Sequence, residues 1–196
     1  MYFWQNLYFR MKKKFLVIVS VIFFISCKEN KTKAIENTKI DSVIVAKPKQ
    51  KENFKVKLNG VFNKDDKFAL FYIEYDSEKY NTNKLVTTKF LGSKAPQEIS
   101  FEVPPDVYPL SFRLDLGSNE EQLAVKIYEC ILSYKGESYV IEGKDLRKYF
   151  NFNEGIKMQS DSVTFKLKTF KANGKDRYDP FMYGNKNLTE VLDFEL

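Results

Sequence analysis

The fold of this chain is decided by the stretch LSFRLDL, residues 110–116, in which apolar and polar residues alternate. Successive side chains of a β-strand point to opposite faces, so one set of this stretch is buried and the other faces water. The same alternation occurs in the segments 54–58, 99–103 and 163–167. The sequence therefore predicts several strands that are buried on one face.

Two segments depart from this simple alternation. Segment 68–75 is apolar on both faces, so we expect a strand that is covered on both sides. Its faces consist of Phe68, Leu70 and Tyr72 on one side and Ala69, Phe71 and Ile73 on the other. In segment 123–134 the apolar phase shifts near Tyr128 and Glu129, which predicts a β-bulge.

Turn-forming runs rich in Gly, Pro, Asn and Asp separate the predicted strands. They lie at 63–66, 92–93, 104–105, 117–119, 135–136, 153–155 and 173–174. Only 144–150 has apolar residues at helical spacing. Residues 54–196 suffice for one domain. The pattern predicts an all-β fold, an antiparallel, jelly-roll-like β-sandwich with one short helix, and leaves a barrel as the alternative.

A short apolar segment precedes this domain. Lysines at 12–14 lead into the eleven residues 15–25, all apolar except Ser20, and Ser26 and Cys27 follow. A membrane-spanning helix needs about 20 apolar residues, whereas the apolar region of a secretory signal has roughly 7–15. The order indicates a signal peptide whose cleavage leaves Cys27 as the first residue. It predicts a location in the cell envelope.

The end of that segment, residues 24–27 (FISC), resembles the lipobox of bacterial lipoproteins, although Phe24 stands where Leu is usual. The resemblance implies diacylglycerol on the Cys27 sulfur and a further acyl group, such as palmitate, on the new amino terminus. Several acyl chains give a stable membrane anchor. A plain cleaved signal or an uncleaved apolar tail is the alternative.

Residues 1–27 are thus interpreted as a leader and lipoprotein signal. Within them, 1–10 form an extension without signal character, because Met11 followed by lysines is the better start. Residues 28–53 are expected to form a flexible tether, since this stretch has no aromatic residue and few large apolar ones. A short strand at 42–46 is the alternative.

The distribution of charge argues against nucleic acid as a partner. The whole chain carries 32 basic and 26 acidic residues, a net charge of +6. The leader and tether hold eleven of the basic residues and four of the acidic ones, which leaves −1 for residues 54–196. A nucleic-acid-binding domain is normally basic, so the domain lacks that electrostatic signature.

The residue types also argue against catalysis. The chain has no histidine, which excludes a Ser-His-Asp triad and disfavours catalytic zinc. Cys130 is the only thiol left once Cys27 carries lipid, and its place in a predicted strand indicates burial. We expect that the protein is not an enzyme and that it binds neither a metal nor a cofactor.

Paired carboxylates remain as a route to hydrolysis, the least favoured alternative. The candidate carboxylates have no recognisable ligand spacing. These residues are Asp65, Asp66, Glu74, Asp76, Asp115 and Asp179. Asp65 and Asp66 lie in a predicted turn, where aspartate is common for backbone reasons alone.

The segment 177–185, RYDPFMYGN, is the best candidate for a binding loop, because it combines aromatic rings with polar groups. Tyr178, Asp179 and Tyr183 are its candidate ligand-binding residues. An aromatic ring offers a flat apolar face to a sugar, and a carboxylate accepts hydrogen bonds from hydroxyl groups. The alternative is a packed loop in which Tyr178 and Phe181 close the core.

The segments 101–105 (FEVPP), 109–117 (PLSFRLDLG) and 178–180 (YDP) resemble jelly-roll domains of the carbohydrate-binding-module type. The resemblance implies a sandwich that contacts glycan and carries no catalytic residues. Arg113 and Asp115 match it by pattern and join the candidate ligand-binding residues. An exposed ion pair of little energetic value is the alternative for these two.

The resulting interpretation is an envelope lipoprotein, held on a bacterial membrane through lipid on Cys27 and facing the periplasm or the cell surface. Its domain is expected to bind glycan or an envelope protein without catalysis. A structural or assembly subunit that recognises its partner through an exposed strand edge is the alternative.

Overall fold

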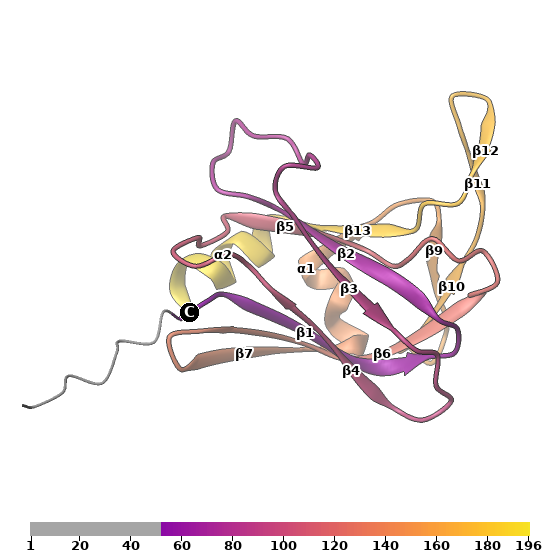
Figure 1. Ribbon diagram of the computed structural model, residues 1–196, viewed down its shortest axis with the longest axis horizontal. Helices are drawn as coiled ribbons and strands as arrows, with labels where there is room; N and C mark the ends of the chain where they lie inside the picture. Colours follow the sequence, from indigo (N-terminus) through magenta and orange to yellow (C-terminus); the bar gives the residue numbers. More distant parts are fainter. Residues whose placement is uncertain (1–51) are drawn as a thin grey trace, which may run out of the picture. The chain divides into compact units, whose positions relative to one another are not determined.

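The computed structural model describes residues 52–196, which form two antiparallel β-sheets packed face to face (Figure 1). Every strand pair is antiparallel, in agreement with the short turns between strands. The predicted antiparallel β-sandwich is therefore confirmed.

Sheet A has the strand order β4-β1-β6-β10-β9, and β7 pairs with β6 beside this path. Its strands are β1 (Lys55–Phe62), β4 (Gln97–Glu102), β6 (Ala124–Tyr134), β7 (Glu137–Glu142), β9 (Ile156–Met158) and β10 (Thr164–Leu167).

Sheet B has the strand order β3-β2-β5-β13-β8. Its strands are β2 (Asp66–Ile73), β3 (Leu85–Phe90), β5 (Ser111–Asp115), β8 (Phe150–Phe152) and β13 (Phe181–Gly184). A separate hairpin of β11 (Phe170–Ala172) and β12 (Lys175–Arg177) links β10 of sheet A to β13 of sheet B.

The alternation in the sequence determines which side chains enter the core. In β5, Phe112 and Leu114 are completely buried, while Arg113 and Asp115 lie on the outer face of sheet B. The bulge predicted in β6 is present, because Asn59 pairs with Glu129 and Gly60 pairs with Ile127. Tyr128 between them is the extra residue.

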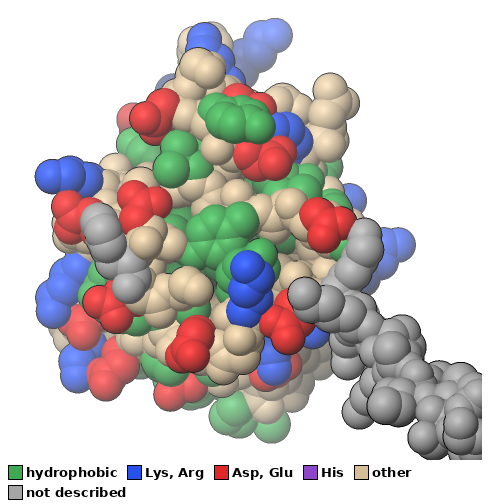
Figure 2. All heavy atoms as spheres, turned by 90° about the vertical axis from the view of Figure 1, so that its left-hand side faces the viewer, with side chains coloured by type: hydrophobic (Ala, Val, Ile, Leu, Met, Phe, Trp, Pro, Cys, Tyr) green, Lys and Arg blue, Asp and Glu red, His purple; other side chains and the backbone are tan. Residues whose placement is uncertain are grey.

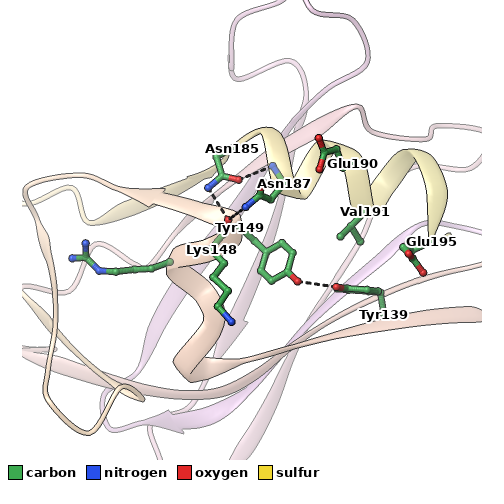
Figure 3. A pocket seen from close by; sticks show the side chains of 9 residues that line it. Tyr139, Lys148, Tyr149, Asn185, Asn187, Glu190, Val191 and Glu195 are labelled. Carbon is green, nitrogen blue, oxygen red and sulfur yellow. Dashed lines mark hydrogen bonds between the residues drawn. The ribbon is translucent and has the colours of Figure 1, made fainter.

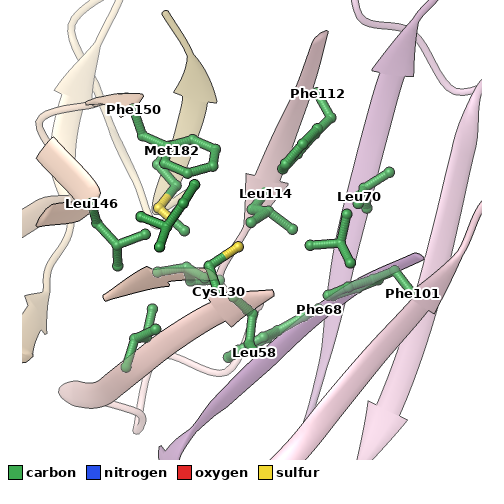
Figure 4. Close-up of a cluster of buried hydrophobic side chains, with 14 of the residues drawn as sticks. Leu58, Phe68, Leu70, Phe101, Phe112, Leu114, Cys130, Leu146, Phe150 and Met182 are labelled. Carbon is green, nitrogen blue, oxygen red and sulfur yellow. The ribbon is translucent and has the colours of Figure 1, made fainter. Parts of the chain in front are cut away.

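Phenylalanine rings from both sheets fill the core. Phe62 of β1 meets Phe68 of β2 edge to face at 5.4 Å between ring centroids, and Phe112 meets Phe150 at 5.6 Å. Cys130 lies among these side chains (Figure 4), and burial raises the pKa of its thiol to about 12. Burying one such aromatic side chain contributes about 1.5–3 kcal/mol to folding.

The sandwich also carries two helical segments, which contact each other. The predicted helix at 144–150 appears as a 3₁₀ turn, Gly143–Asp145, followed by α1 (Leu146–Tyr149). The second helix, α2 (Lys186–Phe194), was not predicted. Its first turn is capped by the Asn185 side chain, which accepts a hydrogen bond from the Asn187 N–H, and it buries Leu188, Val191 and Leu192.

Strand β2 differs in part from the expectation that both of its faces are covered. Its inward residues Phe68, Leu70 and Tyr72 are buried. Its outward residues, Ala69, Phe71 and Ile73, are only half-buried. An apolar strip is therefore left on the outer face of sheet B.

Several sequence predictions lie outside the described residues. These are the leader at 1–27 with Cys27, the possible strand at 42–46, and the tether at 28–53 apart from its last two residues. Within residues 52–196, no helix is long and apolar enough to cross a bilayer.

Candidate functional site

The outer face of sheet B carries a row of side chains in register across all five strands. The pairing aligns Leu85 of β3 with Phe71 of β2, Phe71 with Arg113 of β5, and Arg113 with Tyr183 of β13. Tyr183 in turn pairs with Asn151 of β8. Apolar, cationic and aromatic groups thus form one continuous line across the sheet.

Arg113 is the centre of this row. Its guanidinium lies 4.8 Å from the centroid of the Phe71 ring and 4.1 Å from that of Phe181. Its Nε and Nη2 donate to the two carboxylate oxygens of Asp115, each at 2.6 Å. We call Phe71, Arg113, Asp115, Phe181 and Tyr183 the aromatic face.

Partial burial governs the electrostatics of this pair, since the Arg113 and Asp115 side chains are 22% and 16% exposed. Burial raises the pKa of the Asp115 carboxyl and outweighs the lowering effect of Arg113. Burial also opposes the charge of Arg113, but the hydrogen bonds to Asp115 prevail and raise the pKa of the guanidinium. A planar bidentate pair of this kind is fixed in orientation.

Two projecting segments flank the aromatic face, the loop 74–84 at one end and the β11–β12 hairpin at the other (Figure 1). The loop is attached to the sheet through Tyr80, whose hydroxyl donates to Ser111 Oγ at 3.2 Å. Within the loop, Lys84 Nζ is held by Glu74 at 2.7 Å and by Glu78 at 2.5 Å. These contacts hold the loop in place beside the aromatic face.

Of the five ligand-binding residues predicted from the sequence, Arg113, Asp115 and Tyr183 come together on the aromatic face. Asp179 lies nearby, with its side chain 18% exposed and 2.7 Å from Arg177 Nη2. Its charge acts on both Arg113 and Asp115. Four of the five residues therefore belong to one region of sheet B.

Tyr178 is placed differently, at the edge of the core. Its side chain packs against the buried cluster, and its hydroxyl donates to the Gln122 carbonyl at 3.1 Å. Burial raises the pKa of this hydroxyl to about 12. These contacts support the alternative in which Tyr178 closes the core.

Asp65 and Asp66, two of the carboxylates considered for hydrolysis, are engaged in structural contacts. Asp66 accepts hydrogen bonds from the N–H groups of Lys67, Ser118 and Asn119, and Asp65 accepts one from Gly92. The two therefore tie neighbouring loops together. In residues 52–196, no group of three or more Cys, Asp or Glu side chains could hold a metal ion.

A pocket of about 780 Å³ opens between β7, α1 and α2 (Figure 3). The hydroxyls of Tyr139 and Tyr149 lie 2.8 Å apart and share one hydrogen bond. The side-chain amides of Asn185 and Asn187 both donate to the Lys148 carbonyl. The polar groups that line the pocket thus connect α1 and α2 to each other and to β7.

Figure 2 faces the side of the molecule on which α2 lies in Figure 1 and shows acidic and basic side chains interspersed around hydrophobic ones. Such a surface has no electrostatic field of one sign. With its polar groups bonded to one another, the pocket is a weaker candidate than the aromatic face.

Sequence reasoning missed Phe71 and Phe181 as partners of Arg113. A signal for Phe71 was present, because the segment that forms β2 is apolar on both faces, whereas the other predicted strands alternate. A second apolar face on one strand indicates a surface that the core does not use. Phe181 was part of the candidate binding loop 177–185, but it was named only in the alternative in which it closes the core.

Comparison with known proteins adds nothing to this geometry, since no family model, no curated protein and no solved structure matches the chain.

Proposed function

We propose that residues 54–196 form a non-catalytic binding domain whose ligand is a glycan and whose binding surface is the aromatic face. The observation that carries the proposal is the row of Phe71, Arg113 and Tyr183 in register on an outer sheet face. Folding requires only the inner faces to be apolar, so aromatic rings on this outer face have no role in the core.

The chemistry of the aromatic face fits a sugar. Tyr183 is 39% exposed, and the rings of Phe181 and Tyr183 lie 6.4 Å apart between centroids, so they offer neighbouring apolar surfaces. Arg113 and Asp115 supply donors and acceptors for hydroxyl groups. Because their fork is already formed, little side-chain entropy is lost when a ligand binds.

The proposed setting is the bacterial cell envelope, with acyl chains on Cys27 and residues 28–53 as a spacer. The order of lysines, short apolar segment, Ser26 and Cys27 supports this part of the proposal. The likeness to carbohydrate-binding modules in 101–105, 109–117 and 178–180 supports the glycan part.

Binding by the aromatic face is tested with two tyrosines of equal exposure on opposite sheets. Tyr183 is 39% exposed on sheet B, and Tyr128 is 37% exposed on sheet A. On a glycan array probed with the full-length chain, we expect Tyr183→Ala to lose at least about tenfold in affinity, or about 1.4 kcal/mol. Tyr128→Ala should bind as the wild type does.

Circular dichroism serves as the control, because both variants should keep the wild-type spectrum. The proposal fails if Tyr183→Ala is folded and binds normally, or if the two variants lose binding equally.

The membrane anchor has its own test. Metabolic labelling with a fatty-acid analogue should mark the wild-type chain and leave Cys27→Ala unlabelled, because only a thiol at this position can accept the diacylglycerol group. Labelling of both proteins to the same extent would contradict the proposed localisation.

One observation favours the alternative of an assembly subunit. Strand β7 pairs with β6 alone, and Val140 in its middle is 50% exposed. A partner strand could add to this edge through main-chain hydrogen bonds. Binding of an envelope protein that is lost in Val140→Lys, together with normal glycan binding by Tyr183→Ala, would favour this alternative over the aromatic face.

A further inference from the structure

The β11–β12 hairpin concentrates positive charge in a domain that is nearly neutral. The hairpin itself, residues 170–177, contains three basic residues and one acidic residue, and Lys166 and Lys168 lie just before it, whereas residues 54–196 as a whole carry a net charge of −1. The side chains of β12 are all exposed. The charge is therefore localised on a projecting, accessible element.

Internal pairing neutralises only part of this charge. Lys171 pairs with Asp176 at 3.1 Å and Arg177 pairs with Asp179 at 2.7 Å. In the described part of the chain, Lys166, Lys168 and Lys175 have no ion-pair partner. Of these three, Lys175 is the one that lies on the hairpin, and its charge is available to an external anion.

The neighbouring strand adds another lysine. Lys166 of β10 lies directly opposite Lys157 of β9, and both side chains are exposed. Like charges directly opposite each other across a strand pair destabilise a sheet. Both lysines lie on the outer face of sheet A, away from the aromatic face, so they are not part of the surface proposed below.

The hairpin is continuous with the aromatic face. Phe170 pairs with Arg177 and Ala172 pairs with Lys175, so Arg177 and Lys175 project from the same side of the hairpin. Arg177 reaches Asp179, whose charge acts on Arg113 and Asp115. A ligand that lies on the aromatic face can therefore extend to Arg177 and Lys175.

We propose that the glycan is acidic, with its rings on the aromatic face and its carboxylate, sulfate or phosphate groups bound by Lys175 and Arg177. This inference rests on the proposed function. The Arg177 side chain is 61% exposed and donates to Asp179 through Nη2, so further donors of its planar fork face solvent. Charge-assisted bonds from arginine to carboxylate, sulfate or phosphate are the stronger ones.

An anionic membrane is the other class of partner that such a hairpin could meet. Its tip consists of Asn173 and Gly174, both with positive φ, and carries no large apolar side chain that could insert between lipids. The rings of the aromatic face lie on the sheet, and the aromatic residue of the hairpin, Phe170, pairs with Arg177 at its base and not at its tip. Both points favour a polymer that spans the two surfaces.

The test uses two double variants of the full chain that change the net charge by the same amount. The hairpin variant carries Lys175→Gln and Arg177→Gln, and the control carries Lys55→Gln and Lys57→Gln on sheet A. The probes are dextran sulfate and uncharged dextran, measured by titration calorimetry at two salt concentrations. Circular dichroism checks that both variants are folded.

We expect the wild type to bind dextran sulfate more tightly than dextran. The hairpin variant should lose about tenfold in affinity for dextran sulfate, with a weaker salt dependence. The control should stay within about twofold, because its lysines lie on the opposite sheet. Equal losses in both variants, or no binding of dextran sulfate by the wild type, would overturn the proposal.

Two further measurements separate the possible failures. If Tyr183→Ala binds both polymers normally, the proposed function fails together with this inference. If Tyr183→Ala weakens binding while the hairpin variant keeps the preference for sulfate, this inference alone fails. Binding to phosphatidylglycerol vesicles is measured with Cys27→Ala in every chain. If the hairpin variant loses binding to these vesicles but still binds dextran sulfate normally, the partner is a membrane and the proposal is overturned.

Discussion

The outer faces of the two sheets are built from the same strand geometry but from different residues. On sheet A, Lys57 pairs with Glu98 at 3.1 Å, and these side chains are 36% and 45% exposed. On sheet B the central ion pair is Arg113 with Asp115, at less than a quarter exposure and between two phenylalanine rings. One face is solvated and the other is partly desolvated.

The difference shows which residues the fold needs and which it does not. Both inner faces are apolar, because the sandwich is held together by burying them. The outer face of sheet A meets water through exposed ion pairs, which contribute little to stability. The outer face of sheet B exposes apolar surface that the fold does not require, and such a surface marks an interaction site.

The largest expected effect separates the two faces of strand β2. Phe68 is fully buried and packs on Phe62 and Phe90, so Phe68→Ala should lower the free energy of unfolding by about 3–5 kcal/mol. Phe71, three residues on, faces outward, and Phe71→Ala should cost about 1 kcal/mol through its lost contact with Arg113. Urea unfolding of the full chain measures both values.

The distinction between the two faces of β2 is contradicted if Phe68 and Phe71 contribute equally to the free energy of unfolding. A cost near 3 kcal/mol for Phe71→Ala would mean that the outer face of sheet B is a second packed layer rather than a binding surface.

A smaller effect separates the two ion pairs. Arg113→Ala leaves the Asp115 carboxylate partly buried without its two hydrogen bonds, which should cost about 1.5–3 kcal/mol. Lys57→Ala removes an exposed partner of Glu98 and should cost about 0–1 kcal/mol. Thermal unfolding of the two variants side by side gives the difference, and equal losses would contradict the distinction between a desolvated and a solvated face.

The framework of the sandwich was predictable because a strand with one buried face alternates strictly. The stretch 110–116 became β5, and the change of apolar phase in 123–134 became the bulge at Tyr128. The capping residue Asn185 and the spacing of Leu188, Val191 and Leu192 also contained the signal of α2, but the sequence analysis identified only 144–150 as helical.

The candidate site was only partly predictable. Arg113, Asp115 and Tyr183 were named, but their grouping with Phe71 and Phe181 depends on which strands become neighbours. Strands β2, β5 and β13 are distant in the sequence, and local patterns contain no information about their pairing order. Tyr178 illustrates the converse, because exposure in a loop cannot be told from packing at the edge of the core without the partner, Gln122.

The smallest effect that we predict concerns pH, and it uses two aspartates whose pKa values move in opposite directions. Burial raises the pKa of Asp115 on sheet B above its ordinary value of 3.8. Asp161, in the turn before β10 of sheet A, accepts hydrogen bonds from the hydroxyl and the N–H of Thr164, which lower its pKa. The two carboxyls should therefore change the stability of the protein in opposite senses as pH rises.

Between 3.8 and its raised pKa, native Asp115 holds more proton than the unfolded residue does, so its contribution to stability falls as pH rises through that interval. Asp161 behaves in the opposite way: its contribution to stability is present above the unfolded pKa and is lost as pH falls toward the native pKa.

Urea unfolding between pH 3 and pH 7 compares the wild type with Asp115→Asn and with Asp161→Asn. The stability advantage of the wild type should shrink with rising pH against the first variant and grow against the second. An advantage that grows against both would mean that Arg113 outweighs the burial of Asp115, and the outer face of sheet B would then be as solvated as that of sheet A.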